Sequence, residues 1–319
     1  MEQSPSEFDY QPLPLPKRVA DHEWPPNTRP LLSIVCTTYN HVDFIRDCIE
    51  GFLKQETSFP VEILIHDDAS SDETADIVES YRRQHPTLIK AVCQAENQYS
   101  RGVKVLQTFI RPLVRGKYVA SCEGDDYWVD PRKLEIQVGF LEQNPGYAVS
   151  AHDAMMIDQH GTILKKSLLS GRDKRDCAGE ELMAGNVWIL TMARVYRDYA
   201  SPEHVPEAAC VLAGDRLTTA ILGSFGAYKY HPEIEPAVYR SHPGGVWSEI
   251  SAKGQLETRI STYFWIYRYF SRTANINIAN QWEKRFFIYG ARAIPFSFLL
   301  REILIRATFA RQFVNWFRR

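Results

Sequence analysis

The stretch CEGDDYW, residues 122–128, decides how this chain is interpreted, because it places three acidic side chains directly after the strand-like run 117–121. Neighbouring carboxylates resist joint ionisation, since their negative charges repel one another. A divalent cation removes that repulsion, and carboxylate oxygens suit Mg²⁺ or Mn²⁺. A second acidic pair, Asp67-Asp68, ends another hydrophobic run, 61–66. The two acidic strand ends together predict a site for a cation and a nucleoside diphosphate.

Hydrophobic runs and helical periodicities alternate through the first half of the chain. The predicted strands cover 31–38, 61–65, 88–93 and 118–121, and the predicted helices cover 44–53, 73–84 and 103–115. Such alternation favours a parallel, doubly wound α/β sheet, in which ligands bind at the carboxyl ends of the strands. The polar segments 37–40, 67–71 and 123–128 each follow one of these strands. We therefore expect them to meet at one edge of the sheet.

The second half is predicted to continue the pattern before the composition changes. The expected elements are a helix at 131–144, strands at 147–157, 187–193 and 235–240, and helical stretches around 210–222. The expected domains are a proline-rich arm (1–30), an α/β domain (31–250) with a nucleotide-binding half (31–130) and an acceptor half (131–250), and a C-terminal helical extension (251–319). The arm is expected either to dock on the domain or to stay extended on its surface.

The composition limits the classes of protein that fit. A net charge of −2 gives no basic field, so no nucleic-acid partner is expected. The six cysteines lack metal-binding spacing, which argues against structural disulfides and zinc and favours a reducing compartment. The sequence opens with no secretory signal and contains no run of about 18 apolar residues that would span a membrane. We expect a cytoplasmic enzyme.

The tail changes character from residue 253 onward: it is helical in propensity and rich in aromatic side chains, and from residue 295 aromatic and aliphatic side chains are interleaved with arginines. Basic, aromatic, amphipathic helices are typical of proteins that lie on a membrane surface, here the inner face of the cell membrane. The alternative is that the helices pack on the domain or on a second copy of the chain, as a homo-oligomer. Both interpretations stay open at this point.

The ordered set of motifs resembles the family 2 glycosyltransferases, which have the GT-A fold. The segments that carry the resemblance are SIVCTTYN (33–40), DDASSDET (67–74), EGDDYW (123–128), DPRKLEIQVGFLEQNP (130–145), Gly214-Asp215 and VYRSHPGGVWS (238–248). The chain is similar in particular to the branch that acts in bacterial surface-polysaccharide assembly. The resemblance implies a Rossmann-like, mostly parallel sheet flanked by helices. It also implies inverting transfer of a sugar from a nucleoside-diphosphate donor, by family habit a UDP-sugar, to an acceptor hydroxyl.

Roles on the nucleotide side of the site follow from the same resemblance. Thr37, Tyr39 and Asn40 would bind the nucleotide, with the Tyr39 ring stacking on the base. Asp68 would accept a hydrogen bond from a ring N–H of the base. Asp67 is expected to hold its loop through backbone N–H groups. The alternatives are that Tyr39 packs against the next helix and that Asp68 caps one.

The resemblance assigns the cation to the second acidic stretch. Asp126 would bind Mg²⁺ or Mn²⁺, with Asp125 near the ribose or a metal-bound water, and the cation would offset the charge of the leaving diphosphate. His242 would complete the metal shell or contact the diphosphate, unless it is a hydrogen-bonded core histidine. Glu123 stands where an aspartate is common in the family, so we place it in the donor/acceptor pocket with its role open.

The remaining candidates lie on the acceptor side. Asp215 occupies the place of the late acidic motif and would act as the base that deprotonates the acceptor hydroxyl, paired with Arg216. An aspartate that caps a helix is the alternative. Arg240 would stabilise charge on the leaving phosphate. Two tryptophans, Trp128 and Trp247, would wall the sugar pocket or pack in the core. The partners implied are a nucleotide-sugar donor and a saccharide or lipid-linked saccharide acceptor.

Two other classes of protein were weighed against this interpretation. A sugar nucleotidyltransferase also uses carboxylates and a metal on an α/β sheet, but it usually has a glycine-rich, basic loop after the first strand. The corresponding segment here, TTYNHVDF (37–44), has no glycine, lysine or arginine. A non-catalytic nucleotide-binding scaffold would not need both Asp126 and Asp215. The sugar, the acceptor and the linkage are not encoded in any spacing of the sequence.

Overall fold

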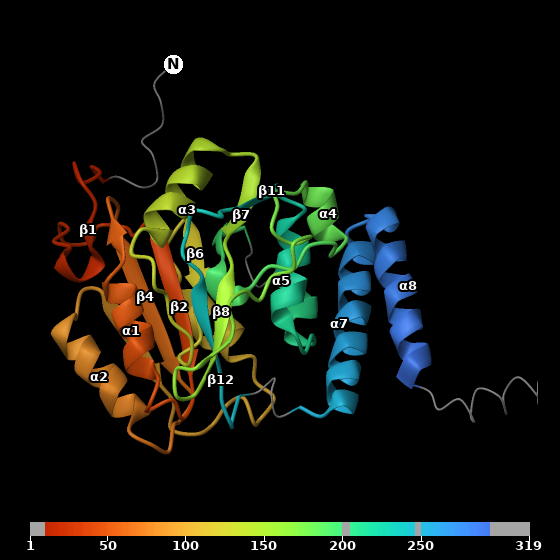
Figure 1. The fold of residues 1–319 in the computed structure, drawn as a ribbon, viewed down its shortest axis with the longest axis horizontal. Helices are drawn as coiled ribbons and strands as arrows, with labels where there is room; N and C mark the ends of the chain where they lie inside the picture. Colours follow the sequence, from red (N-terminus) through yellow and green to blue (C-terminus); the bar gives the residue numbers. More distant parts are fainter. Residues whose placement is uncertain (1–9, 200–204, 246–249, 294–319) are drawn as a thin grey trace, which may run out of the picture.

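The computed structural model of the protein describes residues 10–199, 205–245 and 250–293. Its centre is a seven-stranded, mostly parallel sheet (Figure 1). In spatial order its strands are β11 (Ala227–Tyr230), β7 (Tyr147–Ala151), β10 (Val195–Arg197), β6 (Tyr118–Ser121), β2 (Leu32–Thr38), β4 (Val61–Asp67) and β5 (Ile89–Cys93). Strand β10 alone runs antiparallel to both of its neighbours. The expected α/β fold with a predominantly parallel sheet is confirmed.

Helices and short helical turns connect and cover the strands (Figure 1). The helices are α1 (Ile45–Leu53), α2 (Thr74–Gln84), α3 (Lys133–Gln143), α4 (Gly179–Met183), α5 (Gly214–Leu222), α7 (Ala252–Arg272) and α8 (Ile276–Ala293). The helical turns are η1 (Val19–Asp21), η2 (Leu106–Ile110), η3 (Arg111–Leu113), η4 (Thr191–Ala193) and η6 (Pro206–Ala209). Every residue of β4 is buried, as expected for a central parallel strand with both faces covered.

A second sheet brings the end of the α/β domain to the acidic loop. Its strands are β12 (Ala237–Ser241), β8 (Ala154–Asp158) and β9 (Ile163–Lys165), in that order. The backbones of Tyr127 and Val238 exchange two hydrogen bonds, of 3.2 and 2.9 Å. This bridge joins CEGDDYW to β12, although the two segments are far apart in the sequence. The residues that follow Val238 are thereby placed beside the aspartates.

The N-terminal arm docks on the domain over its described part. Strand β1 (Lys17–Arg18) pairs with β3 (Glu56–Thr57), and the side chain of Val19 is buried in the main core. Of the two interpretations of the arm, docking holds for residues 10–30. Residues 1–9 lie outside the described part of the chain.

The C-terminal helices α7 and α8 pack side by side beyond α5 (Figure 1). They share a separate hydrophobic cluster with α5, in which Ile266, Phe270 and Trp282 are buried. The Trp282 indole donates a hydrogen bond of 2.8 Å to the carbonyl of Met183. Residues 252–293 therefore pack on the domain. None of the helices in the described ranges is both long and apolar enough to cross a bilayer. The basic segment 294–319 falls outside those ranges.

Three predicted elements were wrong in detail. The run 147–157 forms two strands, β7 and β8, which separate at His152-Asp153, because the strands join different sheets. The segment 187–193 ends in a 3₁₀ turn, and the strand lies just beyond it as β10. The expected helix 103–115 is reduced to η2 and η3. Pro112 lacks a backbone N–H and has a fixed φ, so it disfavours a regular helix there.

Candidate active site

The acidic loop is held tightly against the end of β2. The backbone N–H of Cys122 donates to the carbonyl of Val35 at 3.1 Å, and that of Gly124 donates to Thr37 at 3.0 Å. A Cβ atom at Gly124 would lie 2.5 Å from Thr38 Oγ1, so only glycine allows this approach. The loop is therefore pre-positioned at the carboxyl end of the sheet by backbone contacts.

Asp126 is a buried carboxylate with one oxygen left over. Its Oδ1 accepts the backbone N–H of Arg240 at 2.9 Å, while its Oδ2 is buried and has no hydrogen-bond partner among the described residues. Burial raises the pKa of Asp126 well above its usual range, and the neighbouring charges of Asp125 and Glu123 add to the shift. An unpartnered buried carboxylate is costly, and a bound cation would remove that cost.

Asp125 faces two histidines. Its Oδ2 lies 3.1 Å from His242 Nε2 and 3.9 Å from His41 Nε2. Burial alone would raise the pKa of Asp125, but the hydrogen bond from His242 and the proximity of both rings outweigh it and lower the pKa. The same hydrogen bond raises the pKa of His242. Burial lowers the pKa of His41.

Two overlapping groups of side chains can hold a metal ion. One consists of Glu123, Asp125 and Asp126, and the other of His41, Asp125 and His242; in each group the ligand atoms lie within 4.8 Å of one another. The predicted metal ligands Asp126 and His242 thus both border the site, but His242 contacts Asp125 rather than Asp126. The donor set of carboxylates and imidazoles fits a divalent cation such as Mn²⁺.

Glu123 is electrostatically linked to the candidate base. Desolvation by the surrounding protein raises the pKa of Glu123 to about 7, and the negative charges of Asp125 and Asp215 add to the rise. Its side chain is nevertheless exposed. Water therefore reaches this carboxylate, and we regard the neighbouring negative charges as the firmer cause of the shift.

Asp215 lies in the first turn of α5, where Ala213 occupies the N-cap position. The alternative of an N-cap aspartate is therefore wrong. The Asp215 side chain makes no hydrogen bond or ion pair with any described residue, whereas its carbonyl accepts a 3.3 Å hydrogen bond from Arg194. Arg216 does not pair with Asp215 and instead lies over the ring of Tyr263. The carboxylate is thus left available for an incoming group.

The pair Asp67-Asp68 is bound differently. Asp67 accepts hydrogen bonds from the backbone N–H and the hydroxyl of Ser70, as expected for a structural residue. The two oxygens of Asp68 accept the backbone N–H groups of Gln98 and Tyr99, both at 2.9 Å. Each oxygen of Asp68 keeps a second lone pair, so a contact with a base remains chemically available. In the structure, however, Asp68 joins two loops.

The neighbouring predicted nucleotide ligands have mixed environments. The Tyr39 side chain is 43% exposed. Asn40 has a positive φ of 54°, which asparagine tolerates, and its Oδ1 accepts the backbone N–H of Ser71 at 2.8 Å. Thr37 is half-buried at the end of β2. Tyr39 is therefore the member of this group that is free to stack on a ring.

Two predicted pocket residues are placed otherwise than expected. Trp128 is 3% exposed, packs on Phe52 and donates a 2.7 Å hydrogen bond to the carbonyl of Met192, so it belongs to the core and does not wall a sugar pocket. The buried guanidinium of Arg240 donates to Asp47 at 2.8 Å and to the carbonyl of Asp125 at 3.1 Å. It clamps the acidic loop to α1, and the predicted phosphate contact stays a prediction. Trp247 lies outside the described residues.

The sequence analysis missed three residues that the structure brings to the site. His41 follows the quoted segment TTYN directly, so its position after a strand end was an available signal. Asp47 holds Arg240 from α1. Arg194 is buried, and its guanidinium donates to Thr219 Oγ1 at 3.1 Å and to the backbone carbonyl of Asp215 at 3.3 Å. Nothing in the local sequence distinguishes Asp47 or Arg194 from ordinary charged residues.

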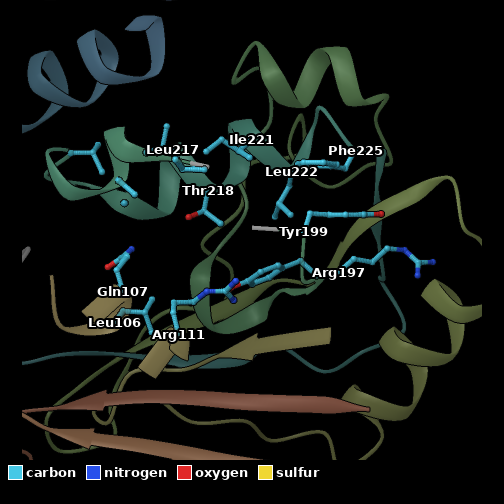
Figure 2. Close-up of a pocket in the computed structure, with 15 residues that line it drawn as sticks. Leu106, Gln107, Arg111, Arg197, Tyr199, Leu217, Thr218, Ile221, Leu222 and Phe225 are labelled. Carbon is cyan, nitrogen blue, oxygen red and sulfur yellow. The ribbon is translucent and has the colours of Figure 1, made fainter. Parts of the chain in front are cut away.

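A cavity lies beside α5, between that helix, η2 and β10 (Figure 2). Its walls are mainly apolar, with Leu217, Ile221 and Leu222 from α5 opposite Leu106. Gly214 also lines it, one residue before Asp215. Among the described lining residues, none was predicted to act in catalysis or binding. The cavity thus borders the helix of the candidate base without being part of the acidic cluster.

Residues 33–178 match the family model for glycosyl transferase family 2. The chain is 37% identical over 217 residues to an uncharacterized protein of Mycobacterium tuberculosis, which covers 68% of this chain and 60% of that protein. It is 34% identical over 112 residues to WfaP of Escherichia coli, described as a UDP-Glc:alpha-D-GlcNAc-diphosphoundecaprenol beta-1,3-glucosyltransferase, across 35% of this chain and 41% of that one. The chain thus spans well under two thirds of these relatives.

Solved structures show the same fold. The fragment 1–349 of Staphylococcus aureus TarS, crystallised with UDP, superimposes with a TM-score of 0.52 at 18% identity, over 73% of this chain and 64% of that one. The same fragment with UDP-GlcNAc gives a TM-score of 0.52 at 16% identity, over 73% of this chain and 66% of that one. Over residues 33–178 the chain therefore matches glycosyl transferase family 2, and it shares the GT-A fold of these solved structures.

Proposed function

We propose that the protein transfers a sugar from a nucleoside-diphosphate sugar, with a UDP-sugar as the favoured donor, to an acceptor hydroxyl with inversion at the anomeric carbon. The observation that carries the proposal is the buried, unpartnered Oδ2 of Asp126 beside Asp125 and Glu123, at the carboxyl end of the sheet. This arrangement suits a cation shared with a diphosphate. The matched family and the UDP complexes of TarS support the same donor class.

The nucleotide side would be formed by the ends of β2 and β4. Tyr39 would stack on the base, and Thr37, Asn40 and Asp68 would frame it. Asp125, Asp126 and His242 would hold Mn²⁺ or Mg²⁺, which when bound neutralises charge on the leaving diphosphate. Arg240 would act indirectly, by fixing the acidic loop through Asp125 and Asp47.

Asp215 would take the proton from the acceptor hydroxyl. Its carboxylate is unpaired among the described residues, while its backbone is anchored by Arg194, so the base is accessible and positioned at once. Exposed Glu123, which is grouped with Asp125 and Asp126, would border the reacting sugar. Within the α/β domain, residues 31–130 would then bind the nucleotide and residues 131–250 would supply the acceptor side.

Asp215→Asn tests this assignment directly. A thermal-shift panel of nucleotide sugars with Mn²⁺ identifies the donor, and donor turnover is then measured with and without candidate lipid-linked acceptors. We expect unchanged donor binding and a loss of turnover of about 10²-fold or more, because the base is removed. Asp76→Asn is the matched control, since Asp76 is an exposed acid in the first turn of α2. Full turnover by Asp215→Asn would place the base elsewhere.

The acceptor and its location are also proposals. A saccharide on a lipid carrier, made during polysaccharide or glycolipid synthesis, fits the described activity of the similar WfaP protein. We propose that the basic tail 294–319 holds the cytoplasmic enzyme at the membrane that carries such an acceptor. Truncation at residue 293 should then abolish co-sedimentation with anionic vesicles. Equal co-sedimentation of the full and truncated chains would argue against a membrane role for the tail.

A further inference from the structure

We propose that His41 is a cation ligand together with Asp125 and His242, and that these two imidazoles make the protein select a transition-metal ion such as Mn²⁺ or Co²⁺ over Mg²⁺. This inference rests on the proposed function and names the cation preference of that site. It concerns a residue that was not predicted from the sequence.

The three side chains lie close enough together to share one cation. The Nε2 atoms of His41 and His242 approach the same oxygen of Asp125, at 3.9 and 3.1 Å, and the three ligand atoms lie within 4.8 Å of one another. Neighbouring ligand atoms on an octahedral cation with bonds of about 2.1 Å lie about 3.0 Å apart. The His242–Asp125 distance already matches that value. His41 needs a movement of less than about one ångström to match it.

The hydrogen bond at Nδ1 of His242 determines what Nε2, on the other side of the ring, can do. His242 Nδ1 lies 2.8 Å from the carbonyl oxygen of Pro243, and a carbonyl only accepts, so Nδ1 carries the proton. In the neutral ring Nε2 is then a lone-pair donor that faces a carboxylate oxygen. Two such atoms at 3.1 Å repel each other unless a cation, a second proton or a metal ion, lies between them.

His41 is oriented in the same way. Its Nδ1 lies 3.2 Å from Thr38 Oγ1, which leaves Nε2 directed at Asp125. Histidines that bind metals usually have the other nitrogen held by such an oxygen, which fixes the ring. The backbone around His41 is also fixed, because its N–H donates to Thr74 Oγ1 at 2.8 Å and its carbonyl accepts the N–H of Ile45 at 2.8 Å.

The ligand types in this group also discriminate between divalent cations. Mg²⁺ prefers oxygen ligands and keeps its waters, whereas imidazole nitrogen is a ligand of transition-metal ions and binds them more strongly along the series from Mn²⁺ to Co²⁺. A site with two imidazoles and one carboxylate therefore disfavours Mg²⁺ relative to Mn²⁺ and Co²⁺. Glu123 and Asp126 form a second group with the same Asp125 and would supply further oxygen ligands.

The test measures binding to the full chain and needs no turnover. The affinity for Mn²⁺ is obtained from the electron paramagnetic resonance signal of free Mn²⁺, with Mg²⁺ as competitor, and Co²⁺ is followed by its visible absorption. We expect His41→Gln to weaken Mn²⁺ binding about tenfold or more and to change the Co²⁺ spectrum, with little change for Mg²⁺. His41→Asp, which replaces nitrogen by oxygen, should move the preference toward Mg²⁺.

His160→Gln is the matched control, because His160 lies in the exposed turn between β8 and β9. Circular dichroism and thermal unfolding check that each variant is folded. Wild-type Mn²⁺ affinity and an unchanged Co²⁺ spectrum in His41→Gln would overturn the inference. Equal affinity of the wild type for Mg²⁺ and Mn²⁺ would also overturn the inference. The close contact of His242 with Asp125 would then be explained by a proton between the two side chains.

Asp126→Asn separates failure of this inference from failure of the proposed function. If Asp126→Asn loses Mn²⁺ but His41→Gln keeps it, the cation is bound by carboxylates; the proposed function then stands and the role of His41 does not. If neither variant changes metal binding and UDP binds equally well without metal, the cation site of the proposed function fails as well.

Discussion

The two aspartate pairs of this protein lie at the ends of strands of the same sheet, yet their carboxylates differ in how fully they are hydrogen-bonded. Asp67 and Asp68 are buried, and all four of their oxygens accept hydrogen bonds. Asp126 is equally buried but keeps one oxygen without a partner among the described residues. Asp125 meets two histidines. The first pair closes loops, and the second pair is arranged to receive a cation.

The difference teaches how to distinguish a structural carboxylate from a functional one. Backbone N–H groups that point at a carboxylate satisfy its charge and make it part of the fold. A buried carboxylate beside other acids, with an oxygen that has no such donor, costs free energy in the absence of a ligand. The same letters, Asp-Asp, therefore predict different roles once the donors around them are known.

The largest effect should come from Asp126→Asn. We expect turnover to fall by about 10²-fold or more, because a metal ligand that stabilises the leaving group is lost. The melting temperature without metal should stay the same or rise, since an unpartnered buried charge is removed. Scanning calorimetry with and without Mn²⁺ and UDP measures the melting temperature, and a donor-turnover assay measures the activity. A lower melting temperature with normal turnover would make Asp126 structural, like Asp67.

Asp67→Ala should show the reverse pattern. It removes two hydrogen bonds from Ser70 and leaves a partly buried N–H without this partner, so we expect a loss of about 2 kcal/mol in the free energy of unfolding. Turnover per folded molecule should change only a few-fold. Urea unfolding measures the first quantity, with Asp76→Ala as control at an exposed site. A large loss of turnover without destabilisation would place Asp67 in the active site.

The smallest effect concerns the pH dependence of stability. The pKa of Glu123 rises from its usual 4.5 to about 7 on folding, so between these values the folded state holds a proton that the unfolded chain has released. The contribution of Glu123 to stability is therefore greatest below pH 4.5 and is lost as the pH rises through 7.

Glu123→Gln removes this dependence. Without metal, the melting temperature of the wild type should fall relative to that of Glu123→Gln as the pH is raised from 4.5 to 7.5. The difference between the two proteins cancels the titration of shared groups. Parallel curves would show that exposure to water screens Glu123 from its acidic neighbours. Added Mn²⁺ should reduce the difference, since a cation compensates the charge.

The C-terminal helices show a different limit of the sequence. Their aromatic composition left packing and membrane contact as equal interpretations, because both need an apolar face. In the structure residues 252–293 pack on the domain, where Trp282 and Phe270 are buried against α5 and its neighbours. The surface that covers this apolar face is set by the elements that the fold places beside it, and the local sequence does not identify them.

The sequence by itself determined the parallel strands β2, β4, β5 and β6 and the polar segments at their ends, because hydrophobic runs and helical periodicity are local signals. It also identified Asp126, Asp215 and His242 as candidates. The tertiary structure decided which donor meets which acceptor: β12 brings His242 to Asp125, the β10 strand runs antiparallel, and Trp128 enters the core. Such pairings depend on distances between residues far apart in the chain, which no local pattern encodes.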